Sequence, residues 1–303
     1  ILFGVLMYTL YVLYLTIPGE PENLSVSIEK PMYNEDMITA EVKQFYPQMK
    51  FNDNQISYNI DKNCLVKEVE RMNKAFNEIS MKVNRINFYQ TSSAPDIQII
   101  CTEALKEDIN KDFFIAGEGG AKEIIPTGRY NIITNGIIYL YEKDKKSVSC
   151  DYPNIEVHEL LHVFGFNHST NKKSIMYPFL ESCDQIIDSS IIDKLESLYR
   201  EENLPDLYFE NLTVIKKGRY LNFNTTIKNS GLIDSGNVSL TVIDNEGIVE
   251  TYYLGNISFG GGIFIYTTNL QLNSRNPESI IFVIDEENKI KAPEAASNIK
   301  INA

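Results

Sequence analysis

The chain has 303 residues, of which 43% are hydrophobic and 11% aromatic. This composition excludes wholesale disorder, and the length leaves room for two domains with full hydrophobic cores. The formal net charge is -13, and because an acidic surface repels phosphate backbones, nucleic acid is excluded as a partner class.

Residues 1–17 carry no charge and are followed by Pro18. At 1.5 Å per residue, a helix of this length falls just short of the roughly 30 Å of hydrocarbon in a bilayer. Three interpretations are open: an uncleaved signal anchor, a cleavable signal sequence, or a buried core helix. No small-x-small cleavage site follows, so we favour a transmembrane anchor over residues 1–18. The rest of the chain, membrane-anchored or else secreted, would then lie outside the cytoplasm, with residues 19–45 as a polar linker or stalk.

A first folded domain is predicted from residue 46 to residue 202. Residues 65–83 place apolar side chains at spacings of four and three, as an amphipathic helix does. Three short β-type runs flank this helix, and together they predict an α/β layer in which the helix packs on a sheet. The runs cover residues 55–61, 86–90 and 96–101.

The second half of this domain begins with a glycine-rich stretch, residues 117–120, which we predict to be a flexible loop. Residues 121–126 are a candidate edge strand. Residues 131–142 alternate around an Asn-Gly pair, and the pattern leaves open whether they form one bulged strand or a small hairpin. Two helices are predicted to follow, at residues 153–164 and 185–200.

The character of the chain changes after residue 202. Residues 203–303 show no helical stripe but a series of alternating runs, separated by turns rich in Gly and Asn. This pattern predicts an all-β, immunoglobulin-like sandwich domain. The runs cover residues 208–214, 219–228, 237–244, 250–254, 263–272 and 279–285.

The four cysteines, Cys64, Cys101, Cys150 and Cys183, form no CxxC pair, so a cysteine-based zinc site is not expected. An even number of cysteines in an exported chain indicates two disulfides, and four cysteines permit three pairings. Free buried cysteines are the alternative.

The chemistry concentrates in residues 157–168, VHELLHVFGFNH, which hold all 3 histidines of the chain. Residues four apart on a helix lie about 40° apart around its axis, so His158 and His162 can share one ion. Gly165 permits a left-handed turn at the helix end, and this turn lets His168 supply a third ligand. Three imidazoles leave a fourth position for water, which is the arrangement of a catalytic zinc site.

Glu159 lies about 100° around the same helix from His158, beside the metal but poorly placed to bind it. We expect this carboxylate to take a proton from the attacking water and to pass it to the leaving amine. The predicted reaction is peptide-bond hydrolysis without a covalent enzyme intermediate.

Met176 follows His168 by eight residues, within the sequence SIMYP. The motif HExxHxxGxxH followed by a turn that bears Met resembles the signature of the metzincin metallopeptidases. The short spacing and the SIMYP sequence are most similar to the matrixin branch, including matrixin-like peptidases of prokaryotes and archaea. The resemblance covers residues 46–202.

This resemblance implies an α/β (α+β) catalytic domain with a twisted mixed sheet, an active-site helix and one catalytic Zn2+. It implies that Met176 lies beneath the ligands as an apolar floor. Tyr177, Pro178 and Phe179 would help to form the wall of the main specificity pocket, although Pro178-Phe179-Leu180 departs from the family's Pro-x-Tyr and leaves the preference open.

The same layout implies a substrate site and a disulfide pairing. An antiparallel edge strand, at residues 121–126 or 131–142, would bind an extended peptide by strand addition. Cys64 would pair with Cys101, and Cys150 with Cys183. No PRCGxPD-like segment precedes the domain, so latency through a cysteine switch has no support, and three committed histidines exclude a second histidine-bound zinc.

Residues 204–207, LPDL, and 226–231, TIKNSG, resemble CARDB-type sandwich modules of prokaryotic surface proteins. The resemblance implies a module that binds a surface partner or acts as a spacer; a passive stabilising domain is the alternative.

The leading hypothesis is a zinc endopeptidase that cleaves extracytoplasmic peptide or protein substrates. The first alternative is a catalytically silent cell-surface peptide-binding or adhesion protein on a peptidase fold, and the intact Glu159 argues against it. The second is a zinc hydrolase of non-peptide amide bonds, against which the matrixin-like turn argues.

Overall fold

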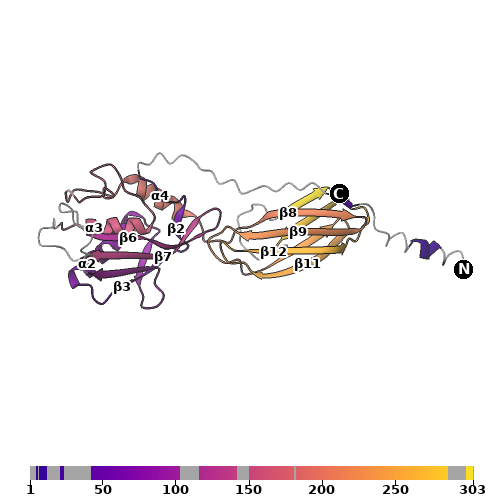
Figure 1. Ribbon diagram of the computed structural model, residues 1–303, viewed down its shortest axis with the longest axis horizontal. Coiled ribbons are helices and arrows are strands. Elements are labelled where there is room, and N and C mark those ends of the chain that lie inside the picture. The colour runs from indigo at the N-terminus through magenta and orange to yellow at the C-terminus, as the bar shows by residue number, and fades with distance from the viewer. Residues whose placement is uncertain are drawn as a thin grey trace. The chain divides into compact units, whose positions relative to one another are not determined.

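The computed structural model describes residues 42–102, 116–141, 150–180, 182–285 and 298–302, together with residues 5, 7–11 and 21–23. The chain divides into two compact units (Figure 1). One unit is Glu35–Asn203, and the other comprises Leu204–Ala303 and Ile1–Asn34. Among the described residues, no helix is long and apolar enough to cross a membrane. The anchor predicted over residues 1–18 falls mostly outside the described part of the chain and stays a prediction.

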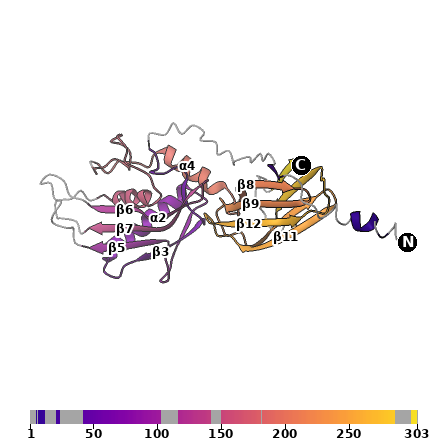
Figure 2. The same cartoon turned by 45° about the vertical axis from the view of Figure 1, so that its right-hand side comes forward.

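The first unit is built on a six-stranded mixed sheet in which β2, β3, β4, β5 and β7 are all parallel, and β2 and β5 pair with different parts of one edge of β7. β6 pairs antiparallel with the other side of β7 (Figure 2). The predicted twisted mixed sheet is therefore confirmed. The strands are β2 (Met49–Phe51), β3 (Gln55–Ile60), β4 (Asn87–Gln90), β5 (Ile97–Thr102), β6 (Gly117–Pro126) and β7 (Asn131–Tyr141).

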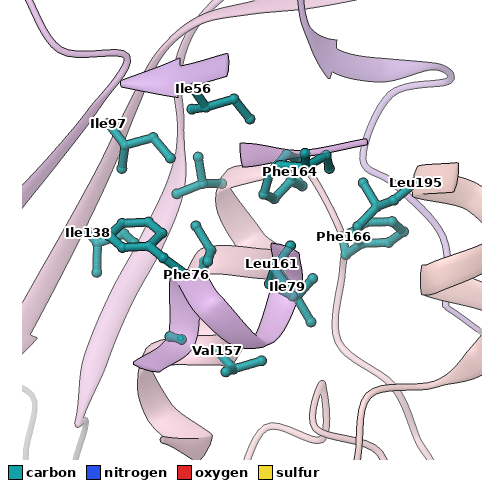
Figure 3. Close-up of a cluster of buried hydrophobic side chains, with 14 of the residues drawn as sticks. Ile56, Phe76, Ile79, Ile97, Ile138, Val157, Leu161, Phe164, Phe166 and Leu195 are labelled. Atoms are coloured by element: carbon teal, nitrogen blue, oxygen red, sulfur yellow. The ribbon is translucent and has the colours of Figure 1, made fainter. Parts of the chain in front are cut away.

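Two helices, α2 (Val66–Lys82) and α3 (Asn154–Val163), pack on the sheet, and α4 (Ser189–Arg200) completes the unit. The apolar stripe of α2 and one side of α3 meet the inward-facing side chains of the central strands (Figure 3). α3 is nearly buried all round, which explains why the sequence around the histidines is so apolar. Side chains from each layer fill this core: Ile56, Phe76, Ile79, Ile97, Ile138, Val157 and Leu161.

Three predictions about this unit need correction or refinement. Residues 117–120, predicted as a flexible loop, are the first residues of β6. Residues 131–141 form one strand rather than a hairpin, with register shifts in its pairing to β6. The last helix begins at Ser189, several residues later than expected. Ile186 pairs with Ser174 through a β-bridge, and the Asp188 side chain accepts a hydrogen bond from the Ser174 hydroxyl, so the residues before Ser189 are not helical.

The unit also extends further towards the N-terminus than residue 46. Val42 is only 3% exposed, and Gln44 forms an antiparallel bridge with Phe166. Residues 42–45, which were predicted to belong to the linker, are therefore packed on this unit.

Two disulfides join the elements of this unit, with the pairing that the resemblance implies. Cys64, before α2, is bonded to Cys101 in β5, with a Cα–Cα distance of 5.0 Å. Cys150, before α3, is bonded to Cys183, beyond Met176, with a Cα–Cα distance of 5.4 Å. The second bridge closes a loop around the segment that carries all three histidines.

The second unit is a sandwich of two four-stranded antiparallel sheets, ordered β1-β8-β9-β12 and β11-β10-β13-β14. The all-β prediction is confirmed, although the pattern missed the short strands β1 and β14, and β1 lies within the predicted linker. The two sheets enclose a core that includes Phe209, Phe223, Leu240 and Phe282. The strands are β1 (Pro21–Asn23), β8 (Leu207–Lys217), β9 (Tyr220–Asn229), β10 (Asn237–Asp244), β11 (Gly247–Asn256), β12 (Gly262–Gln271), β13 (Ser279–Ile284) and β14 (Asn298–Asn302).

Candidate metal centre and active site

The three histidines converge on one point at the C-terminal half of α3. The Nε2 atoms of His158 and His162, one helical turn apart, lie 3.0 Å from each other. The Nε2 atom of His168 lies 3.2 Å from that of His162. This is the only group of three imidazoles that the chain can form, since it has 3 histidines in all.

The hydrogen bonds of the other ring nitrogens test whether this group fits a metal. His158 Nδ1 lies 2.7 Å from the carbonyl oxygen of Ile175, and His162 Nδ1 lies 2.7 Å from that of Phe166. A carbonyl oxygen only accepts, so each Nδ1 carries the proton and each Nε2 presents a lone pair. Two lone pairs at this distance repel unless a cation lies between them. The donor set, three imidazoles of which two have their tautomer fixed by a backbone carbonyl, fits Zn2+.

The surroundings favour the neutral, metal-binding form of all three rings. Burial, followed by the proximity of His162, lowers the pKa of His158 to about 4. Burial likewise lowers the pKa of His162 and of His168. A ring that resists protonation keeps its Nε2 lone pair available near neutral pH.

Gly165 makes the turn that brings His168 back to the helix. Its φ is +84°, and its N–H donates to the carbonyl of His162, while the N–H of Phe166 donates to that of Leu161. These two bonds form a Schellman motif, which ends the helix. The positive φ favours glycine, and a Cβ at Gly165 would lie 2.2 Å from Sδ of Met49, so a larger residue would also require the Met49 side chain to move.

Glu159 is buried between α3 and the start of β6. Its carboxylate accepts a hydrogen bond from the backbone N–H of Gly119. A Cβ at Gly117 would lie 2.9 Å from Glu159 Cγ, and one at Gly119 would lie 2.2 Å from the Glu159 carbonyl oxygen. Burial, with a further contribution from the nearby Glu118, raises the pKa of Glu159 to about 8. A buried carboxyl group on the helix that carries two of the imidazoles is a candidate for accepting and returning a proton.

The turn that carries Met176 contacts one of the ligands, His158, and the role of Met176 as an apolar floor stays a prediction. Met176 is fully buried, and the preceding residue, Ile175, provides the carbonyl that orients His158. Ser174 holds this turn, because its hydroxyl donates to the Asp188 carboxylate and accepts from the Met176 N–H at 3.0 Å. Sequence reasoning missed the bond between Ser174 and Asp188, because these residues lie 14 positions apart and Asp188 belongs to no motif.

The three residues proposed for the pocket wall follow this turn directly. The rings of Tyr177 and Phe179 meet edge to face at 5.8 Å, and Phe179 is 41% exposed. Pro178 is also exposed. Their role towards a substrate stays a prediction.

A buried ion pair fixes the start of α3, and no motif or periodicity indicated it. Arg71 of α2 forms a bidentate pair with Glu156, at 2.7 Å and 2.9 Å. The same guanidinium donates to the carbonyl oxygens of Cys150 and Tyr152, at 2.6 Å and 3.2 Å. Arg71 therefore joins α2, the Cys150–Cys183 bridge and the metal-binding helix.

Comparisons with known proteins agree with the two-domain reading. Residues 50–200 match the family model of the matrixins, and residues 204–302 match that of the CARDB family. A curated relative is Metalloendoproteinase 4-MMP of Arabidopsis thaliana, which is 29% identical over 97 residues. That match covers 31% of this chain and only 28% of the plant protein.

Two solved structures are similar to parts of this chain. One is a domain of a putative cell surface protein from Methanosarcina acetivorans, with 18% identity and a TM-score of 0.25; it covers 33% of this chain and 89% of that structure. The other is a CARDB domain from Pyrococcus furiosus in complex with di-metal ions, with 14% identity and a TM-score of 0.26; it covers 33% of this chain and 87% of that structure.

Proposed function

We propose that this chain, which belongs to the matrixin family over residues 50–200 and to the CARDB family over residues 204–302, is a zinc endopeptidase. One observation carries the proposal: three Nε2 atoms converge on one point, and the residue that follows His158 in α3 is a buried glutamate. Neither a structural histidine cluster nor a passive peptide-binding surface needs that carboxylate.

In this proposal His158, His162 and His168 hold the ion. Zinc supplies a Lewis acid that polarises the scissile carbonyl and lowers the pKa of a bound water towards about 7. The protein supplies the proton transfers: a carboxylate oxygen of Glu159 takes a proton from the attacking water and later gives it to the leaving nitrogen. The Gly119 N–H fixes that carboxylate against β6, so the proton acceptor is already oriented.

The substrates we propose are proteins outside the cytoplasm, bound as extended chains. β6 has a free side, because among the described strands it pairs only with β7, and an extended peptide can pair with that side. Two disulfides support an oxidising location, either secreted or on the cell surface. The CARDB domain is proposed as the module that holds the enzyme near a surface partner.

The test is cleavage of unfolded casein by the full chain and by Glu159→Ala, with zinc content measured by mass spectrometry. Both proteins should hold about one zinc per chain, because Glu159 is not a ligand, and only the wild type should cleave. Glu70→Ala, at an exposed position on α2, is the matched control and should behave as the wild type. A Glu159→Ala protein that still cleaves, or a wild type without zinc, contradicts the proposal. If both bind zinc and neither cleaves, a silent peptide-binding protein is the better description.

A further inference from the structure

The segment that enters the catalytic domain runs alongside the metal centre. The N–H of Phe45 donates to the carbonyl of Gly165 at 2.8 Å, and the N–H of Asn167 donates to that of Lys43 at 2.9 Å. These bonds pair residues 43–45, antiparallel, with the turn that connects His162 to His168. Neither motif nor periodicity pointed to this segment, which the sequence analysis assigned to a linker.

The Gln44 side chain fastens the same segment. Its Nε2 donates to the carbonyls of Met49 and Phe164, at 2.7 Å and 2.9 Å, and its Oε1 accepts from the N–H of Met49 at 3.1 Å. The backbone on both sides of Phe45 is therefore held by five hydrogen bonds, three to the end of α3 and the turn after it and two to Met49.

The Phe45 ring itself is left exposed on this fixed backbone. It lies against the ring of the metal ligand His162, with ring centroids 6.4 Å apart and an interplanar angle of 30°, while 54% of Phe45 remains accessible. An aromatic ring that is fixed beside a metal ligand and about half exposed to solvent can bury further apolar surface when a ligand binds. Because the backbone is already ordered, contact with this ring loses little conformational entropy.

The direction of a bound peptide decides which of its residues meets this ring. Gly119 of β6 lies against Glu159, and two residues later Ala121 pairs with Gly136, which lies against Val163. β6 and α3 therefore run in the same sense. A chain that adds antiparallel to β6, the more stable pairing, runs from the His162 end of α3 to the His158 end. Its residues on the N-terminal side of the scissile bond then lie near Phe45.

We infer that Phe45 is a specificity-determining residue of this active site. Its ring contacts a substrate side chain on the N-terminal side of the scissile bond and selects an apolar side chain there. The inference rests on the proposed peptidase function. It assigns part of the substrate site to a residue that lies outside the histidine motif of residues 158–168.

Peptides that end in a C-terminal hydroxamate test this without relying on turnover. The hydroxamate binds zinc, and the peptide extends from it on the N-terminal side only. Titration calorimetry on the zinc-loaded full chain compares peptides that carry Leu or Ser at each of the three positions before the hydroxamate. We expect the wild type to prefer Leu by about tenfold at one position, and Phe45→Ala to remove that preference while keeping its zinc. Phe45→Leu should retain most of it.

Tyr46→Ala is the matched control, because Tyr46 is a neighbouring aromatic residue with similar exposure, 55%, and no ring contact with a ligand histidine among the described residues. It should keep the wild-type preference. The inference is overturned if Phe45→Ala leaves every preference unchanged, or if it weakens all peptides equally, which would mean that the ring only shields His162. A wild type that binds zinc but shows no Leu preference also overturns it. A wild type with the predicted preference and no cleavage of casein contradicts the peptidase proposal instead, and leaves the role of Phe45 standing.

Discussion

Two glycines of β6, Gly117 and Gly119, lie so close to Glu159 that a side chain at either position would collide with it. At Gly119 a Cβ would lie 2.2 Å from the Glu159 carbonyl oxygen, and this backbone atom cannot move without moving α3. We expect Gly119→Ala to lower the free energy of unfolding by about 1–3 kcal/mol, the usual range for overpacking, and to slow proteolysis at unchanged zinc content. Urea unfolding and a casein assay measure the two effects.

Gly120→Ala is the control for this prediction, since no atom lies within 4 Å of a Cβ at Gly120. Its unfolding free energy should stay within about 0.5 kcal/mol of the wild type. Equal effects of the two substitutions would show that glycine matters here for chain flexibility and not for the contact with Glu159.

Lys50 provides a second prediction at the scale of one residue. Its side chain is fully buried, its Nζ donates to the carbonyl of Leu198 at 2.9 Å, and it lies 4.7 Å from the centre of the Tyr199 ring. Burial lowers the pKa of Lys50 to about 8, an effect that nearby Glu201 only partly opposes. The unfolded chain, with the ordinary value of 10.5, therefore holds this proton more tightly than the folded protein does.

Stability should consequently rise as the pH goes from about 8 to about 10.5, because the folded state loses the buried charge first. Relative to Lys50→Met, the wild type should gain up to about 3 kcal/mol over this range, since one pKa unit is worth about 1.4 kcal/mol. Urea unfolding at several pH values measures the difference, with the exposed Lys67→Met as control. A difference that does not change with pH would mean that Lys50 is solvated in the folded protein.

Sequence alone identified the residues whose chemistry depends on spacing within one helix and the turn after it. His158, His162, His168 and Glu159 are of this kind; the structure brings the three histidines together and buries Glu159 on the same helix as two of them. It could not identify Arg71, whose partners lie 79 to 85 residues away, nor the role of Gly119, because these depend on which elements pack together. The prediction of a loop at residues 117–120 was wrong for the same reason. Glycine is needed there because α3 packs closely on the strand, and the strand forms because β7 offers it a backbone partner.

At the scale of elements, the two disulfides close loops of similar length but hold different parts of the fold. Their sequence separations are 37 for Cys64–Cys101 and 33 for Cys150–Cys183. In the chain-entropy model, loss of either bridge should lower stability by about 3–4 kcal/mol. Only the second bridge connects the start of the metal-binding helix to the segment beyond Met176.

We therefore expect the double variants Cys64→Ala/Cys101→Ala and Cys150→Ala/Cys183→Ala to lose similar unfolding free energy but to differ in zinc affinity. Competition with a fluorescent zinc chelator should show weaker binding by the second variant alone. Equal zinc affinities would mean that Arg71 and the Ser174 network position the ligands without help from the bridge.

Long helices and strands with a periodic hydrophobic pattern were predicted well from the sequence, and strands of about three residues were not. The stripe over residues 65–83 and the alternating runs after residue 203 became α2 and the sandwich strands, because their periods match the faces they bury. β2 and β1, three residues each, are too short to show a period and form only because β7 and β8 offer backbone partners. Packing of residues 42–45 on the catalytic domain is likewise a tertiary effect.

At the scale of the whole molecule, each unit has a separate hydrophobic core, and the two cores share no residue. A domain with its own core can unfold cooperatively on its own. In the proposed function zinc binds the folded state of the first unit, through ligands that the unfolded chain does not hold together, so it should stabilise that unit and leave the sandwich unaffected.

Differential scanning calorimetry of the full chain should therefore show two transitions, of which only one moves to lower temperature when a chelator removes the metal. At free zinc about a hundredfold above the dissociation constant, the stabilisation amounts to about 2.7 kcal/mol, which corresponds to a shift of several degrees. His162→Ala should make that transition insensitive to zinc, and Leu240→Ala, in the fully buried core of the sandwich, should lower the other one only. A single transition that responds to both the metal and Leu240→Ala would mean that the two units fold as one, and the CARDB domain would then contribute directly to the stability of the catalytic centre.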